Sequence, residues 1–180
     1  MFLYGKQVII EGGEIMAFNL PDIIELTDFG GDFISYNEAV YAIFKNDFVR
    51  KKPYFRGTKL GLKKYPLVDN KEYTYYHFTH DGDVETDREP NMRRMERIAW
   101  PSPIINHSEN TDLKVWRNIR RGRGGTKKRI LIFCENENYL VVLEDRGKYI
   151  LPWTAYLVQD RKKRKLIDEY KKYIKAETAK

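Results

Sequence analysis

The chain has 180 residues, of which 42% are hydrophobic and 33% charged, and its formal net charge is +7. A chain of this length and composition can form one globular domain that buries roughly 70% of its unfolded surface. No apolar run approaches the ~18 residues that a membrane-spanning helix needs, which excludes an integral membrane protein.

The single cysteine, Cys134, cannot form a disulfide within the chain and is expected to be a buried core thiol. The N-terminus has neither the basic region nor the small-residue cleavage site of a signal peptide. The cytoplasm is therefore the expected compartment.

Residues 1–70 are expected to form an N-terminal appendage, a hairpin followed by a helix, that packs on the rest of the chain. Residues 6 to 19 contain two short strand-like runs around Gly12-Gly13. The pattern from Ser35 to Glu38 is a capping box, and apolar residues at helical spacing follow it. A helix is thus predicted to begin there.

The region from Tyr73 to Trp100 opens the predicted core, residues 71–180. Its first seven residues are aromatic and β-branched, which predicts a strand over Tyr73 to Thr79. Pro90 stands at a favourable first-turn position, so a helix is predicted to follow it. The prolines after Trp100 are expected to stop that helix.

From Leu113 onward, short β-type runs alternate with turn residues, which predicts an antiparallel meander. The runs are LKVWRNI, KKRILIFCE, YLVVLED, YILPW and TAYLV, with a break at Pro152 between the last two. Asp160 is expected to cap a final amphipathic helix. The expected fold is α+β, a twisted antiparallel sheet of about four to five strands with helices packed on one face.

Positive charge is concentrated in two segments of the C-terminal half. Residues 113–129 contain eight Lys or Arg and no acid, and residues 160–180 contain nine Lys or Arg against four acids. Such a surface fits a polyanion, and nucleic acid is the natural partner. The alternative, above all for the final helix, is a solvated face that only keeps the protein soluble.

His77 and His80 are the candidate acid and base, because imidazole titrates near neutrality. Their three-residue offset would place them on opposite faces of a regular strand, so they can share a site only if the strand ends or bulges near Thr79. Three nearby arginines are suited to clamping phosphate, although Glu96 competes for them as an ion-pair partner. These arginines are Arg93, Arg94 and Arg97.

Thr154 and Tyr156 form a second candidate cluster, just after Pro152. Proline suits an edge or a bulge, where a hydroxyl can be redirected into a cleft. Thr154 is then expected to hold a phosphate oxygen, and Tyr156 to stack on a base or donate its phenolic proton. The alternative is an ordinary strand without a binding role.

The basic strand after Leu113 is expected to follow the RNA backbone, with a tryptophan stacking on a base. The residues expected to bind nucleic acid there are Lys114, Trp116, Arg117, Arg120, Arg121 and Trp153. There is no second cysteine and no HExxH motif, so no metal site and no other cofactor are expected.

Several motifs between residues 73 and 175 resemble phage-associated members of the barnase, EndoU, colicin and RelE-like ribonuclease superfamily. The resemblance rests mainly on ERIAWPSPII and LPWTAY, with HFTH, KRILIF and DEYKKY in support. It implies a small helix-plus-four-stranded-sheet fold, metal-independent RNA cleavage and a role as a toxin or effector. It also implies active positions at His80, Arg97 and Thr154, and less directly at His77, Arg94 and Tyr156.

The expected function is therefore a metal-independent endoribonuclease that cleaves RNA by 2′-OH transesterification. His80 would remove the 2′-hydroxyl proton, and His77 or Tyr156 would protonate the leaving oxygen. Arg97, together with Arg93 or Arg94, would stabilise charge on phosphorus. A neutralising antitoxin or immunity protein is an additional expected partner.

Two other hypotheses remain open. The first is a non-catalytic nucleic-acid-binding or inhibitor protein encoded by a mobile element, which would use the same basic face. The second is a protein-binding module whose histidines and arginines are structural. The sequence does not determine the oligomeric state.

Overall fold

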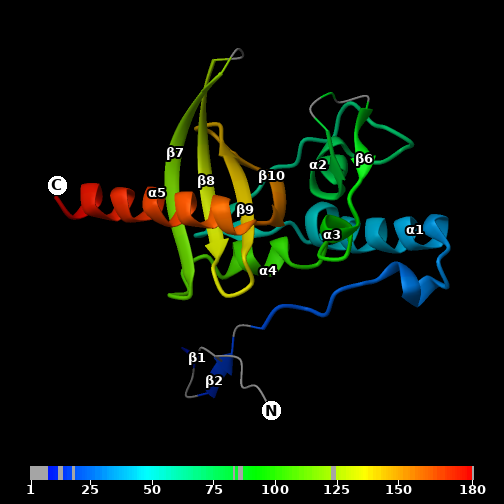
Figure 1. Cartoon of the computed structure of the whole chain (residues 1–180), viewed down its shortest axis with the longest axis horizontal. Helices are drawn as coiled ribbons and strands as arrows, with labels where there is room; N and C mark the ends of the chain where they lie inside the picture. The colour runs from blue at the N-terminus through cyan, green and yellow to red at the C-terminus, as the bar shows by residue number, and fades with distance from the viewer. Residues whose placement is uncertain are drawn as a thin grey trace.

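The computed structural model describes residues 8–11, 14–17, 19–82, 84, 87–122 and 125–179. Its centre is a four-stranded antiparallel sheet, and helices pack on both sides of this sheet (Figure 1). The predicted α+β class with an antiparallel sheet is therefore confirmed.

The sheet is a meander in which each strand pairs with the next one along the chain. Its strands are β7 (Leu113–Gly122), β8 (Gly125–Cys134), β9 (Tyr139–Asp145) and β10 (Ile150–Leu157). The runs YILPW and TAYLV, predicted as separate strands, are two halves of β10. The register shifts between Pro152 and Thr154, which makes Trp153 the extra residue of a bulge.

The two faces of the sheet carry two separate hydrophobic clusters. Successive side chains of a strand point to opposite faces, so Ile130 and Ile132 of β8 pack on one side and Leu131 and Phe133 on the other. The first side is covered by the short helices that precede the sheet, and the second by the final helix α5 (Asp160–Thr178). Helices were predicted on one face only, and α5 departs from that prediction. We call the side under α5 the α5 face.

Short helical segments precede the sheet and pack on its first side or beside it. They are the 3₁₀ helix η1 (Leu26–Phe29), α1 (Phe33–Phe44), the π-helical turn η2 (Lys45–Arg50), α2 (Tyr73–Thr79), α3 (Met92–Met95) and α4 (Pro101–Asn106). Small two-stranded hairpins lie among them or precede them: β1 (Val8–Glu11) with β2 (Glu14–Ala17), β3 (Tyr54–Phe55) with β4 (Thr58–Lys59), and β5 (His80–Asp81) with β6 (Glu89–Pro90). The first of these agrees with the hairpin predicted around residues 12 and 13.

Helix α1 starts earlier than its predicted capping box. Asp32 is the N-cap, and its carboxylate accepts hydrogen bonds from the Ile34 amide and the Ser35 hydroxyl. Ser35 therefore lies in the first turn instead of capping the helix. An acidic side chain at the N-cap also interacts favourably with the positive end of the helix dipole. Asp32 is therefore a stronger signal for the start of the helix than Ser35.

Aromatic packing joins α1 and η2 to α2. Phe44 and Phe48 are almost fully buried, and their rings lie 5.5 Å from Tyr75 and 5.1 Å from Phe78, respectively. These residues belong to the same cluster as the helix-side residues of the sheet. The segment from residue 33 to residue 50 is thus part of the main hydrophobic core.

The prediction of a strand over Tyr73–Thr79 is wrong, because this segment forms the helix α2. Five of its seven residues are buried, and α2 lies against β10 at the edge of the sheet. Burial on more than one side selects large aromatic residues in a helix as readily as in a strand. Tertiary packing has therefore overridden the local β-propensity.

The helix predicted between Pro90 and Trp100 is shorter than expected, and a second short helix lies after Trp100, where none was predicted. Helix α3 begins at Met92, after the N-cap Asn91, while Pro90 pairs with His80 in the β5–β6 hairpin. A new helix, α4, then starts at Pro101, where the missing amide hydrogen costs nothing in the first turn. Helix α5 is preceded by Gln159 as its N-cap, so Asp160 is its first residue and not its cap.

Candidate nucleic-acid interface

Neither candidate histidine is on the surface. The side chains of His77 and His80 are only 5% and 7% exposed. The His77 ring packs between the rings of Tyr73 and Trp153, at 4.4 and 4.9 Å. His80, which follows the end of α2, packs against Tyr76. The two imidazoles thus form part of the packing between α2 and its neighbours.

The surroundings of His80 keep it uncharged. Burial lowers its pKa to about 4, and the nearby guanidinium groups of Arg88 and Arg94 contribute to the shift. Its Nδ1 lies 2.8 Å from the hydroxyl of Thr79. A buried imidazole with this pKa is almost entirely neutral at pH 7, and its ring is poorly placed to exchange protons with a bound substrate.

The three arginines that were predicted as a phosphate clamp are engaged with other groups of the protein. Arg94 holds α2 and β10 together. One of its terminal guanidinium nitrogens donates to the carbonyl of His77 at 3.1 Å and to the hydroxyl of Thr154 at 3.0 Å, and the other pairs with Asp81. Arg97 pairs instead with Glu96 and lies over the ring of Trp100. Arg93 is largely exposed and also reaches Glu96. Ion pairing of these arginines, which was the alternative to a phosphate clamp, is therefore what the structure shows.

The bulge in β10 redirects Thr154, as its sequence position suggested. Its hydroxyl donates to the His77 carbonyl at 2.9 Å and accepts from Arg94, which fastens β10 to α2. Two residues further on, the hydroxyl of Tyr156 accepts a hydrogen bond from Lys162 of α5 at 2.7 Å. Arg94 also lies over the Tyr156 ring. The structure thus brings together Thr154, Tyr156 and Arg94, but not Arg97.

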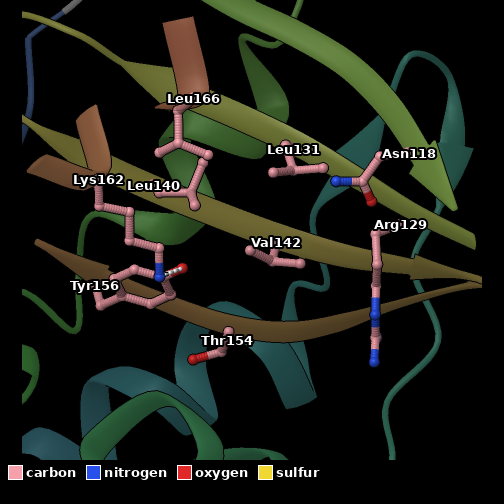
Figure 2. Close-up of a pocket in the computed structure, with 9 residues that line it drawn as sticks. All are labelled: Asn118, Arg129, Leu131, Leu140, Val142, Thr154, Tyr156, Lys162 and Leu166. Atoms are coloured by element: carbon pink, nitrogen blue, oxygen red, sulfur yellow. Dashed lines mark hydrogen bonds between the residues drawn. The ribbon is translucent and has the colours of Figure 1, made fainter. Parts of the chain in front are cut away.

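Thr154 and Tyr156 line a pocket of about 360 Å³ between the α5 face and helix α5 (Figure 2). Leu131, Leu140 and Val142 form its apolar floor, while Lys162 and Leu166 reach it from α5. The remaining lining residues are Asn118 of β7 and Arg129 of β8. Neither was predicted from the sequence as a site residue. An apolar floor with a few polar groups at its margins is typical of a small-ligand site.

Arg129 is held by a buried ion-pair cluster at one end of this pocket. It is 8% exposed and pairs across the sheet with Glu144, which is 2% exposed and also pairs with Arg146. Two guanidinium groups share one carboxylate, so the cluster keeps a net positive charge. Trp153 covers Arg129, with its ring centroid 4.1 Å from the guanidinium carbon, and lies 5.5 Å from Lys127.

A second hollow of about 410 Å³ adjoins the pocket along α5. It shares Lys162 and Leu166 with the pocket, and its other lining residues are Gln159, Arg161, Lys165 and Glu169. Three cations therefore line a groove that begins where the apolar pocket ends. Phosphate groups would be drawn to such a groove.

The residues predicted to follow an RNA backbone have different environments. Trp116 is 1% exposed and donates to Glu169, so it is not available to stack on a base, contrary to the prediction. Lys114 pairs with Glu135 and Arg117 with Asp145, whereas Arg121 is exposed. The side chain of Arg120 lies outside the described residues. Trp153, which is partly exposed, is the tryptophan that remains near the surface.

Within the described ranges, no group of three His, Cys, Asp or Glu side chains is arranged to hold a metal ion. Cys134 is buried, and burial raises the pKa of its thiol, as expected of a core residue. Among the described helices, none has the length and apolarity required to cross a membrane.

Comparisons with known proteins place the chain in no family. No family model matches it, and neither the curated proteins nor the solved structures contain a significant match.

Proposed function

We propose that this protein binds single-stranded RNA on its α5 face, along a surface formed by α5 and the β7–β8 hairpin. The observation that carries the proposal is the juxtaposition of the two most basic segments of the sequence. Helix α5 lies across the sheet and contacts β7 (Figure 1). Glu169 and Tyr170 of α5 meet Trp116 and Lys114 of β7, respectively. Lys114 and Lys127, whose side chains lie on the α5 face, therefore join the cations of α5 in one basic surface.

A single strand fits this surface better than a duplex does. The pocket floor is apolar, and an unpaired base can leave the strand and bury its ring there, while the bases of a duplex are stacked and paired inside the helix. Lys127 and Trp153 lie next to the pocket and can contact the neighbouring nucleotides. Phosphates of the same strand would follow the cationic groove along α5.

Cleavage of RNA is the second candidate function, and one contact favours it. The phenolic oxygen of Tyr156 lies 2.7 Å from the ammonium group of Lys162 inside the pocket. This pair of proton-carrying groups is better placed to meet a bound strand than the buried histidines are. A ribonuclease of this kind would not depend on His77 or His80, and it would require a neutralising protein in the cell that makes it.

The two functions are separated by incubating the purified protein with fluorescent RNA oligonucleotides in the presence of a chelator. Under the RNA-binding proposal, the fluorescence anisotropy rises with protein concentration while the RNA stays intact on a denaturing gel. Single-stranded RNA is expected to bind at least tenfold more tightly than duplex RNA or duplex DNA of equal length.

Two variants refine this experiment. Binding without cleavage by wild type, Tyr156→Phe and His80→Gln alike would support a binding protein. Cleavage that is lost in Tyr156→Phe but kept in His80→Gln would instead establish the second candidate. An absence of RNA affinity at 100 mM salt would rule out both functions.

A further inference from the structure

The pocket under α5 carries a feature that charge alone does not explain. The side-chain oxygen Oδ1 of Asn118 is buried and has no hydrogen-bond partner. The amide nitrogen of the same side chain donates to the carboxylate of Glu169 at 2.5 Å. Because a carboxylate only accepts, this bond fixes which end of the amide faces Glu169. The unpaired oxygen then points toward the Arg129 side of the pocket (Figure 2).

A buried acceptor without a partner loses its hydrogen bonds to water without replacement, so an N–H donor that reaches it is strongly favoured. If the donor belongs to a ring, that ring would lie on the apolar floor formed by Leu131, Leu140 and Val142. The pocket volume of about 360 Å³ lies at the lower end of the range for small-ligand sites, which suits one nucleotide unit better than a larger cofactor.

Lys162 defines the other end of the site. Its ammonium group lies at the junction between the apolar pocket and the groove that Arg161 and Lys165 also line. A negative group attached to the buried ring would therefore lie in this groove. The carboxylate of Glu169 lines the groove too, but it accepts hydrogen bonds from Trp116 and Asn118 at the sheet side. The phosphate is expected on the side of Arg161 and Lys165.

We infer that the pocket between the sheet and α5 is a base-recognition site that accepts one nucleotide whose base carries an exocyclic amino group. The amino group donates to Oδ1 of Asn118, and the phosphate lies beside Lys162. This inference rests on the proposed RNA binding and adds a preference to it. Cytosine and uracil have nearly the same size, but cytosine presents an amino group where uracil presents a carbonyl. The site binds cytosine but disfavours uracil, because the uracil carbonyl and Oδ1 of Asn118 are both acceptors and would face each other.

The test compares oligocytidine and oligouridine decamers, measured by fluorescence anisotropy with the full chain at one salt concentration. We expect the cytidine decamer to bind about tenfold more tightly, the difference associated with one satisfied or unsatisfied buried hydrogen bond. In the Asn118→Leu variant, which keeps a similar volume but lacks the acceptor, the two decamers should bind equally.

A second pair of variants tests the phosphate end. Lys162→Met should weaken the binding of cytidine monophosphate several-fold, measured by amide chemical shifts, while leaving the weak binding of cytidine unchanged. Lys172→Met is the matched control, because it removes the same charge from an exposed position of the same helix. It should change neither affinity. Thermal unfolding of each variant checks that the fold is kept.

The outcomes separate this inference from the proposed function. Equal affinities of the wild-type protein for the two decamers would overturn the base preference and leave RNA binding intact. A cytidine preference that survives in Asn118→Leu would also overturn it, since the acceptor would then play no part. A failure to bind either decamer would overturn the proposed function itself.

Discussion

His80 is a buried histidine whose surroundings oppose protonation. Besides the loss of water around its ring, the guanidinium groups of Arg88 and Arg94 act in the same direction, and only Asp81 opposes them. In the unfolded chain the same imidazole is expected to titrate near 6.5. Folding therefore lowers the pKa of this group, and a pH dependence of stability follows.

Above pH 6.5, His80 is neutral in both states and does not affect stability. As the pH falls from 6.5 to about 4, the unfolded chain binds the proton and the folded chain does not, so the free energy of unfolding decreases. We expect a loss of roughly 2–3 kcal/mol by pH 4.5 from this group. Urea unfolding at pH 7 and at pH 4.5 measures this loss in the free energy of unfolding.

The His80→Gln variant is the control for this loss, because glutamine does not titrate. It should lose less stability than the wild type over the same pH interval. An identical decrease in both proteins would show that His80 is solvated in the folded state and that carboxylates alone cause the acid sensitivity.

At the scale of elements, α1 shows how a segment predicted as an appendage participates in the core. Its buried residues Tyr36, Val40 and Phe44 belong to the hydrophobic cluster that includes Ile130 and Val141 of the sheet. The stability of the sheet and of α1 should therefore be coupled.

We expect Phe44→Ala to destabilise the whole protein by about 3–5 kcal/mol, because it leaves a cavity between the rings of Phe48 and Tyr75. Ile34→Ala on the same helix should change stability by less than about 0.5 kcal/mol, since Ile34 is 76% exposed. Denaturant unfolding followed by both tryptophan fluorescence and circular dichroism tests this. Two separate transitions would show that α1 unfolds independently of the sheet.

For the whole molecule, the uneven charge distribution is the property most directly tied to function. The two basic segments together carry +13, while the net charge is +7, so the rest of the chain is acidic overall. Such an arrangement attracts a polyanion to the basic segments and away from the acidic remainder of the chain. Binding of RNA should therefore depend on both segments at once.

The affinity for single-stranded RNA is expected to fall with salt, and the slope of log Kd against log salt concentration reports the phosphates contacted, at about 0.7 for each. Lys114→Ala with Lys127→Ala in the hairpin, and Arg161→Ala with Lys165→Ala in α5, should each lower that slope. The control is Lys51→Ala with Arg56→Ala, which removes two exposed charges from the N-terminal region. Equal slopes in all of these proteins would contradict a shared RNA-binding surface.

Patterns of near neighbours in the chain were enough to predict the meander of β7 to β10, the α+β class and the concentration of positive charge. Runs of apolar and β-branched residues mark each strand, and turn residues mark where it ends, so these features depend on near neighbours in the chain. The bulge after Pro152 is likewise local, because a residue without an amide hydrogen interrupts the ladder.

Packing between distant segments was needed to place Tyr73–Thr79 in a helix, to bury His77 and His80, and to bring Asn118, Arg129 and Lys162 to one pocket. The three pocket residues come from different elements, and α5 brings the last of them over the sheet. Their convergence depends on packing between segments distant in the chain, which local propensity and spacing do not encode. The location of the candidate site therefore followed from the fold, whereas its positive charge was already evident in the sequence.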